Sequence, residues 1–397
     1  MRKNHIIVFT FLIELCLAIC SCRQKVNIPS TKITTLSHES FEVHDSLKVY
    51  NDSISFEYFV TDRWPQNQLL GFQLPILNLS VIDTLGNIRQ EISRAGLKEQ
   101  QFRAQFIDAK WFNGRMYVLA QGNYFSLSIY DKDLKFIKKI HLSDIMGDNY
   151  APVKTCSFAI LKGSNGNIRV FVSSGDKRYN FYTSKYYKKA YGLMTFELDS
   201  QDQIVNTSNE LRLRDFQTIE NALSTNRRNW NTPNVMFACN DTLLYVKPVF
   251  DNNIYVYNNT TFNLLKIFTL PIPANSESNY TLPFDLELKY NSDTQAQVKI
   301  QYTNIKYVDF KYSKGSLYLM FILPVPLKSL PKNPNDVGSL KLNSTIYKIN
   351  LADKRIKSYT FNSKYNPYSF YLKEPYLLLG SDSELTDSPY LYSIKLN

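Results

Sequence analysis

Two segments of the sequence combine aromatic and basic side chains in a way that suits ligand binding. The first, residues 177–191, contains five Tyr, one Phe, four Lys and one Arg. Aromatic faces stack on sugar rings and on cations, while Lys and Arg pair with anions. The candidate binding residues in this segment are Arg178, Tyr179, Tyr182, Tyr186, Tyr187 and Lys188. The alternative is a long hairpin whose aromatic rings pack on one another while the lysines keep it soluble.

The second segment is Arg227-Arg228-Asn229-Trp230. An Arg guanidinium can hold a carboxylate through two parallel hydrogen bonds, so Arg227 and Arg228 are candidates for binding an acidic group. Trp230 is the candidate stacking residue beside them. The alternative is that Trp230 simply anchors a surface loop.

Catalytic motifs are sparse. The sequence has no G-x-S-x-G, phosphate-loop or H-E-x-x-H motif, and the histidines beyond residue 22 are His38, His44 and His141. Ser/His/Asp chemistry is therefore not expected, and we predict no cofactor. Hydrolysis or elimination that uses only carboxylates needs no such motif and stays open.

A recurring aspartate begins several predicted turns. Asp and Asn favour turns because their side chains bond the backbone that follows. We expect a structural role and no metal site for these residues: Asp83, Asp131, Asp199 and Asp353.

The composition predicts a globular, β-rich protein. The chain has 397 residues, of which 44% are hydrophobic and 20% charged, with 28 Tyr and 25 Phe but only 13 Gly. Aromatic side chains suit the pleated, half-buried surface of a sheet.

The N-terminus has the pattern of an export signal. Arg2 and Lys3 precede an apolar run at 6–20 that is short for a membrane span. Ser21 before Cys22 resembles a bacterial lipobox, in which the cysteine is lipidated. We predict a signal peptide at 1–21, the lipidated Cys22 and a tether at 22–32, and a single domain at 33–397. An ordinary cleaved signal is the alternative.

The net charge and the positions of the cysteines indicate which partners and which thiols to expect. Removing residues 1–21 takes away two positive charges and one negative charge, so the net charge falls from +11 to +10. An excess of this size suits an anionic partner such as lipopolysaccharide, an acidic glycan or lipid headgroups. The stronger alternative is an ordinary solvated surface, because the Lys and Arg are scattered and form no run of five. Nucleic acid is not expected for an exported protein. Cys156 and Cys239 lie in apolar stretches and are predicted to be free thiols.

A degenerate repeat predicts the fold. Residues 105–142 contain four short strands joined by tight turns such as Asn113-Gly114. Similar units follow the same pattern at 55–93, 154–213, 234–270 and 302–362, whereas the last, from Tyr368, offers only three strands. A strand within 36–49 can supply the fourth. We therefore predict an all-β, six-bladed β-propeller closed by its N-terminal strand. A β-sandwich pair and a seven-bladed ring, with a blade in 272–301, are the alternatives.

The repeat also resembles known families. Gly96, Phe102, Asp108, Gly114 and Ile129-Tyr130-Asp131 together look like a degenerate NHL-type or TolB-like six-bladed propeller repeat. With the lipobox ahead of it, residues 33–397 are similar to propeller lipoproteins of Bacteroidetes. The resemblance implies a cell-envelope location, with an outer-membrane anchor, and transfers no site residue.

Loop lengths differ between the two predicted faces. Long segments all fall on one face, which we call the long-loop face: 94–104, 143–153, 178–189, 214–233, 271–301, 324–340 and 381–389. Long loops in a compact fold commonly carry function. We expect this face to bind a glycan, a peptide or a partner protein without catalysis, and to point away from the membrane, with the tether entering on the short-loop side. A carbohydrate-active hydrolase or lyase, or a scaffold subunit, is the alternative.

Overall fold

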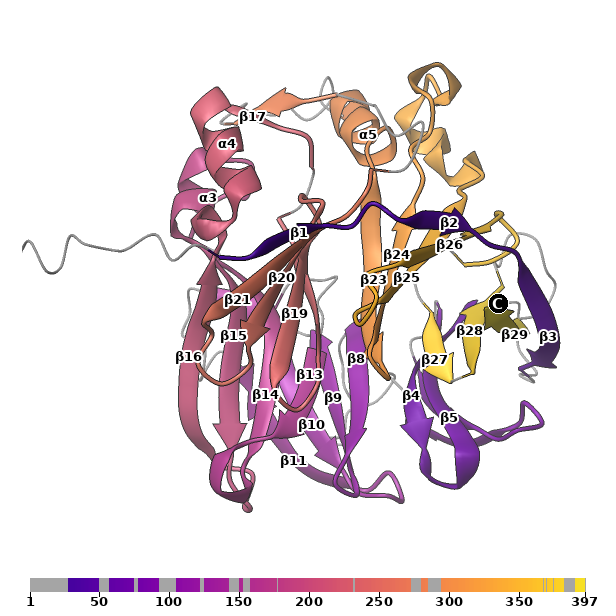
Figure 1. Ribbon diagram of the computed structural model, residues 1–397. Helices are drawn as coiled ribbons and strands as arrows, with labels where there is room; N and C mark the ends of the chain where they lie inside the picture. The colour runs from indigo at the N-terminus through magenta and orange to yellow at the C-terminus, as the bar shows by residue number, and fades with distance from the viewer. Residues whose placement is uncertain are drawn as a thin grey trace, which may run out of the picture.

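The computed structural model describes residues 28–49, 57–74, 78–92, 105–121, 125–142, 150–152, 158–176, 178–230, 233–272, 280–284, 294–366, 368, 370–373, 375–381 and 390–396. Signal peptide, Cys22 and Cys156 lie outside these residues. Six small antiparallel sheets form a six-bladed β-propeller, as the repeat predicts (Figure 1).

Each of the first three blades comes from one continuous stretch of chain. Blade 1 contains β4 (Glu57–Trp64), β5 (Gln68–Leu74), β6 (Leu79–Ile82) and β7 (Ile88–Ile92). Blade 2 contains β8 (Gln105–Phe112), β9 (Arg115–Gln121), β10 (Phe125–Tyr130) and β11 (Phe136–His141). Blade 3 contains β13 (Phe158–Lys162), β14 (Ile168–Asp176), β15 (Tyr191–Leu198) and β16 (Ile204–Arg212), with β12 (Tyr150–Pro152) also paired to β14.

The four strands of blade 4 and those of blade 5 are also consecutive, whereas blade 6 combines both ends of the chain. Blade 4 contains β18 (Val235–Cys239), β19 (Leu243–Pro248), β20 (Asn253–Asn258) and β21 (Leu264–Thr269). Blade 5 contains β23 (Lys306–Ser313), β24 (Ser316–Ile322), β25 (Ser344–Asn350) and β26 (Ile356–Phe361). Blade 6 contains β27 (Tyr371–Lys373), β28 (Tyr376–Gly380), β29 (Tyr390–Leu396) and, from the N-terminus, β3 (Phe41–Lys48).

The predicted closure is confirmed. β3 pairs antiparallel with β29, with Phe41 opposite Leu396 and Lys48 opposite Tyr390. Residues 272–301, where the seven-bladed alternative needs a blade, contain β22 (Leu282–Pro283) and α5 (Thr294–Tyr302) within their described part. The chain therefore closes on six blades.

The hydrophobic core is divided among the junctions between blades. Six buried clusters each join two adjacent blades, and the cluster that contains Val49 joins blade 6 to blade 1. Every residue of β24 is buried, whereas the outer strand β7 alternates between exposed and less exposed positions. Since a single blade leaves its faces uncovered, each blade depends on its two neighbours for burial.

Turns follow the predicted chemistry. Asn113 and Gly114 have φ of +52° and +76°, the left-handed conformation that a two-residue hairpin turn requires. Asp83 Oδ1 accepts hydrogen bonds from the backbone N–H of Leu85 and Asn87. Asp131 and Asp199 hold their turns in the same way, and in blade 5 Asn350 takes this role.

Residues 28–40 form a strap along the outside of the ring, which we call the N-terminal belt (Figure 1). β1 (Ser30–Lys32) pairs parallel with β21 of blade 4, and β2 (Leu36–His38) pairs parallel with β26 of blade 5. The backbone N–H of Ile33 donates to the carbonyl of Thr269. Ser30–Lys32, placed in the tether by the sequence, therefore lie against the propeller.

The belt shows where the chain reaches the ring. Lys32 lies opposite Thr269, the last residue of β21, so the chain meets the propeller at the outer edge of blade 4, follows blade 5 and then completes blade 6 as β3. Entry of the tether at the short-loop side and a long-loop face that points away from the membrane stay predictions, because the residues before 28 lie outside the described part of the chain.

Helical insertions gather on one side of the ring (Figure 1). They are α3 (Ser184–Lys189), α4 (Gln217–Thr225), α5, η4 (Leu327–Ser329) and η5 (Pro334–Ser339), and each lies in one of the long segments identified from the sequence. The long-loop face therefore carries most of the non-β structure of the propeller.

Candidate functional site

Both segments with predicted binding residues are insertions at blade 3. Thr183 caps the start of α3, with its hydroxyl accepting from the backbone N–H of Tyr186, and two tyrosines of α3 point inward. α4 buries Ile219 and Ala222 and ends at Asn226, whose φ of +52° stops the helix. β17 (Arg227–Arg228) then pairs with β22, which fixes the second segment over the first.

The structure brings the two segments into direct contact. Trp230 Nε1 donates a hydrogen bond of 2.8 Å to the Tyr187 hydroxyl, and the two rings meet edge to face at 5.7 Å. Tyr186, Tyr187 and Trp230 expose 5%, 0% and 6% of their surface. These three predicted binding residues therefore lie in the core between blades 3 and 4, where they position the insertions and offer little surface to a ligand.

Arg228 is buried beside this aromatic group, with 2% of its surface exposed. Its Nη1 donates to the carbonyl of Trp230 at 2.5 Å, and its guanidinium lies 5.0 Å from the centre of the Tyr182 ring. Within the described residues, its Nε has no hydrogen-bond partner. Burial lowers the pKa of Arg228, and the neighbouring phenols of Tyr187 and Tyr182 oppose this shift.

The other candidates form an accessible aromatic and basic patch. The patch consists of Arg178, Tyr179, Tyr182, Lys185 and Arg227, with Lys188 exposed on α3 nearby. Tyr179 lies between two cations, 5.5 Å from the Arg178 guanidinium and 4.9 Å from Lys185 Nζ. Arg178 pairs with Asp176 at 2.7 Å, and Arg227 Nε donates to the Thr281 hydroxyl at 2.6 Å.

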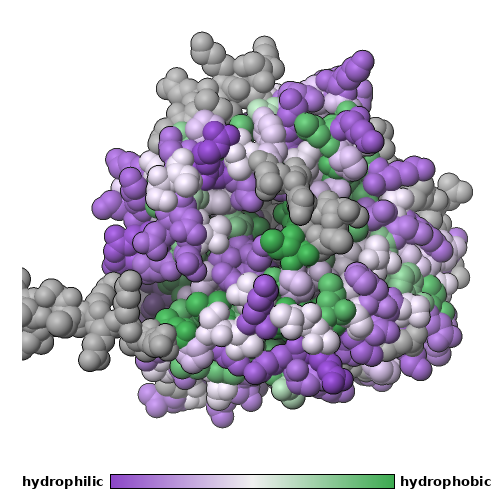
Figure 2. All heavy atoms as spheres, turned by 45° about the horizontal axis from the view of Figure 1, so that its top comes forward, coloured by the Kyte–Doolittle hydropathy of each residue, from purple (hydrophilic) through white to green (hydrophobic). Residues whose placement is uncertain are grey.

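The surroundings of this patch are positively charged. The described residues of 176–190 and 213–230 include seven Lys or Arg and three Asp or Glu. Figure 2 shows hydrophilic side chains over the part of the face that carries α3 and α4, and a small hydrophobic area near its centre. A polar, cationic and aromatic surface suits an anionic or carbohydrate ligand better than an apolar one.

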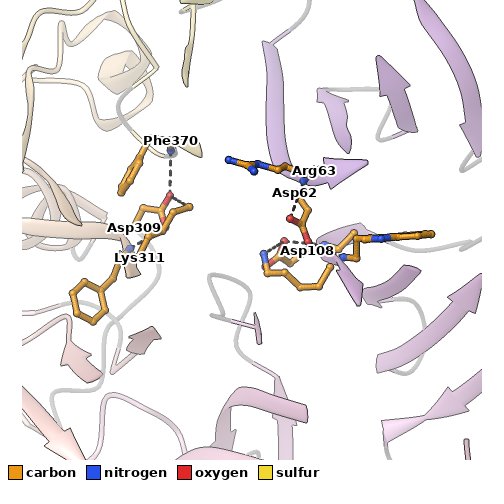
Figure 3. A network of polar contacts seen from close by, with 10 residues as sticks. Asp62, Arg63, Asp108, Asp309, Lys311 and Phe370 are labelled. Atoms are coloured by element: carbon orange, nitrogen blue, oxygen red, sulfur yellow. Dashed lines mark hydrogen bonds and ion pairs between the residues drawn. The ribbon is translucent and has the colours of Figure 1, made fainter. Parts of the chain in front are cut away.

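A second group of charges lines the centre of the ring. It comprises Asp62, Arg63, Asp108, Lys110, Asp309 and Lys311, which we call the channel network. All six residues come from β4, β8 and β23, the first strands of blades 1, 2 and 5, and first strands contact one another round the ring. In Figure 3, Asp62, Arg63 and Asp108 face Asp309, Lys311 and Phe370 across this space.

Ion pairs within single strands neutralise much of the channel network. Lys110 Nζ lies 2.9 Å from Asp108 Oδ2, and Lys311 Nζ lies 2.5 Å from Asp309 Oδ2. Burial raises the pKa of Asp62 and of Asp108. Burial also acts to lower the pKa of Lys110, but the carboxylates of Asp108, Asp62 and Asp309 outweigh it and raise that pKa. Lys110 therefore stays a cation shared by acidic groups from three blades.

Two of these aspartates also join neighbouring blades. Asp62 Oδ2 accepts from the backbone N–H of Trp111 in blade 2 at 2.7 Å, and Asp309 Oδ2 accepts from that of Phe370 before blade 6 at 3.1 Å. Each aspartate follows an irregularity in strand register, a β-bulge that turns its side chain toward the next blade. These hydrogen bonds give the channel network a structural role, because they join neighbouring blades.

The channel network is not among the sites predicted from the sequence. A signal was present, because Asp108-Ala-Lys110-Trp111 and Asp309-Phe-Lys311-Tyr312 repeat one pattern on equivalent strands, and Asp62-Arg63-Trp64 is a shortened form. Alignment of the first strands of all units would reveal it.

Within the described residues, no group of three or more His, Cys, Asp or Glu side chains is arranged to hold a metal ion. The described helices include none that is long and apolar enough to cross a membrane. Cys239 is a free thiol, and burial raises its pKa to about 12, so it is a poor nucleophile.

Comparison with known proteins supports the fold. A DUF4221 family member from Bacteroides vulgatus has a similar structure, with a TM-score of 0.60 and 10% identity over 90% of this chain and 98% of its own. A Bacteroides fragilis protein described as exported gives 0.52 and 12% identity over 92% of this chain and 100% of its own. No family model and no curated protein matches the sequence. At such low identity, the likeness establishes the propeller alone.

Proposed function

We propose that this protein is an exported cell-envelope lipoprotein, anchored in the outer membrane through Cys22, that binds a ligand without catalysis on its long-loop face. The ligand is a glycan, a peptide or a partner protein, and we favour a glycan. The observation that carries this proposal is the contact between the two insertions at blade 3. It presents cations and the half-buried rings of Tyr179 and Tyr182 on a rigid aromatic base.

Several features support the proposal. The Tyr187–Trp230 hydrogen bond and the rings around it fix the insertions from below, so the exposed side chains are pre-organised for binding. Export is supported by the basic and apolar N-terminus and is compatible with the exported protein that shares the fold. Sugar rings stack on Tyr faces such as those of Tyr179 and Tyr182.

A glycan array probed with residues 23–397 tests the function directly. We expect binding to a limited set of glycans, and weaker binding when Tyr179 and Tyr182 are replaced together by Ala. The matched control is Tyr368→Ala, which removes an exposed tyrosine elsewhere in the ring. Absence of binding across the array, with a folded protein, would favour a peptide or scaffold partner.

A carbohydrate-active hydrolase or lyase remains the alternative, and the channel network is the observation in its favour. Asp62 and Asp108 both have raised pKa values, and both interact with Lys110. Paired carboxylates with separated roles are the requirement of glycoside hydrolysis. Release of reducing sugar from a polysaccharide panel, abolished by Asp108→Asn while binding persists, would establish this alternative.

A further inference from the structure

Arg228 is a buried arginine that has no carboxylate partner among the described residues. Its side chain is almost fully buried. The charged or polar neighbours that influence its pKa are the phenols of Tyr187 and Tyr182, and no carboxylate is among them. Burying a cation without an anionic partner is costly, since its hydration is lost and not replaced. Of its donors, Nη1 is used by the Trp230 carbonyl, while Nε has no partner among the described residues.

The nearby acidic groups do not resolve this imbalance. Asp176 pairs with Arg178 at 2.7 Å, and Asp215 lies 3.8 Å from Arg214. The neighbouring tyrosine hydroxyl of Tyr187 accepts from Trp230 Nε1. The described loops around Arg228 carry more cations than anions, so the local field attracts a negatively charged group from outside.

We infer that Arg228 is the recognition residue for an oxyanion, the carboxylate or sulfate group of an acidic glycan, on the long-loop face. This inference rests on the proposed binding function and specifies its ligand class. The oxyanion would accept a hydrogen bond from Nε, the guanidinium nitrogen that has no partner among the described residues, and the Tyr182 ring supports the guanidinium plane. Arg178, Lys185 and Arg227 at the surface would attract the ligand without contacting that group.

Stability measurements provide the first test. If Arg228 serves ligand binding and not folding, its replacement should not destabilise the protein. Arg228→Met removes the buried charge and keeps an apolar stem of similar length. We expect its unfolding temperature, measured without ligand, to equal or exceed that of the wild type. A fall of more than about 5 °C would show that Arg228 is structural and would overturn the inference.

Binding measurements provide the second test. Titration with a sulfated oligosaccharide, a polyuronate oligosaccharide and a neutral oligosaccharide of equal length, followed by Trp fluorescence, separates the two oxyanions from a purely stacking ligand. We expect Arg228→Met to weaken binding of the acidic ligand about 10- to 100-fold, as loss of charge-assisted hydrogen bonds does. Arg228→Lys should recover only part of the affinity, because Lys lacks the planar donor edge.

Arg214→Met is the control, since it removes an exposed cation from the same face. If it weakens binding as much as Arg228→Met does, the effect comes from the overall positive charge of this face, and the inference fails. Equal binding of acidic and neutral ligands would also overturn it, while leaving the glycan-binding function intact. If no oligosaccharide binds, the glycan is excluded as the ligand in favour of a peptide or partner protein, and the inference of an acidic glycan fails; a thermal shift with inorganic sulfate that Arg228→Met abolishes would then still locate an oxyanion site.

Discussion

The carboxylate of Asp62 accepts a hydrogen bond of 2.7 Å from the backbone N–H of Trp111, so one side chain joins the innermost strands of blades 1 and 2. Its other oxygen accepts from the N–H of Arg63. Asp62→Ala leaves both N–H groups without this acceptor, and we expect the free energy of unfolding to fall by about 2–5 kcal/mol. Urea denaturation measures this loss, and Asp241→Ala, an exposed aspartate, should change the midpoint little.

Gly86 should be intolerant of substitution. Its φ is +90°, and an added Cβ would overlap the carbonyl oxygen of Lys48 at the end of β3. Gly86→Ala should therefore destabilise the junction of blades 6 and 1 by several kcal/mol, about 2–4. Gly114→Ala is the matched control, because Gly114 has a similar φ of +76° with open space around it. Equal losses in thermal unfolding would show that backbone strain alone matters and that the contact with β3 does not.

The closing strand, β3, allows a second pair of matched substitutions. The Phe41 ring packs against Phe361 of blade 5 in a tilted arrangement, with 4.5 Å between the ring centres, whereas Val43 on the same strand is 42% exposed. Phe41→Ala should lower the free energy of unfolding by about 2–3 kcal/mol, and Val43→Ala should lower it by less than about 0.5 kcal/mol. If truncation of Phe41 leaves the denaturation midpoint unchanged, closure by β3 does not stabilise the ring.

Lys247 should make stability depend on pH. It is fully buried, its Nζ donates to the carbonyls of Pro248 and Asp251 and lies over the Tyr307 ring, and burial lowers its pKa to about 7. Above pH 7 the folded state releases the proton that the unfolded state still holds, so stability rises with pH toward the unfolded pKa of 10.5.

Between pH 7 and pH 9 we expect the wild type to gain about 2 kcal/mol relative to Lys247→Met. Guanidinium denaturation at several pH values measures the difference. Lys132→Met, on an exposed turn, should follow the wild type. Parallel curves for wild type and Lys247→Met would mean that the buried amine keeps its proton throughout this range.

Lipidation makes a prediction about two neighbouring cysteines. If Cys22 is the acylated residue, Cys22→Ala should abolish incorporation of labelled palmitate and release the protein from the membrane fraction. Cys20→Ala should leave both unchanged, because Cys20 would be removed with the signal. Labelling that survives Cys22→Ala would show that another cysteine, such as Cys20, is acylated, and a wild type without label would establish the ordinary cleaved signal.

The sequence predicted the fold well because each blade carries its own local signals. Turns such as Asn113-Gly114 are determined by the residues that form them. The missing fourth strand of the last unit follows from counting the strands in each repeat. The belt could not be predicted, since three-residue strands such as β1 have no periodicity of their own. The sequence left the burial of Tyr186, Tyr187 and Trp230 open as the alternative to ligand binding, because this burial arises only when two distant insertions meet. Composition alone does not distinguish a stacking platform from a packed one.

The N-terminal belt and β3 have a consequence for how the molecule is made. Residues 30–48 leave the ribosome first, yet their partners at 267–269, 356–358 and 390–396 are made much later. Such distant pairing is slow to form and leaves strand edges uncovered in the meantime. Ring closure should therefore stay incomplete until the C-terminus has been synthesised. A stop codon even seven residues early would leave β3 without its partner strand, although β1 and β2 keep theirs.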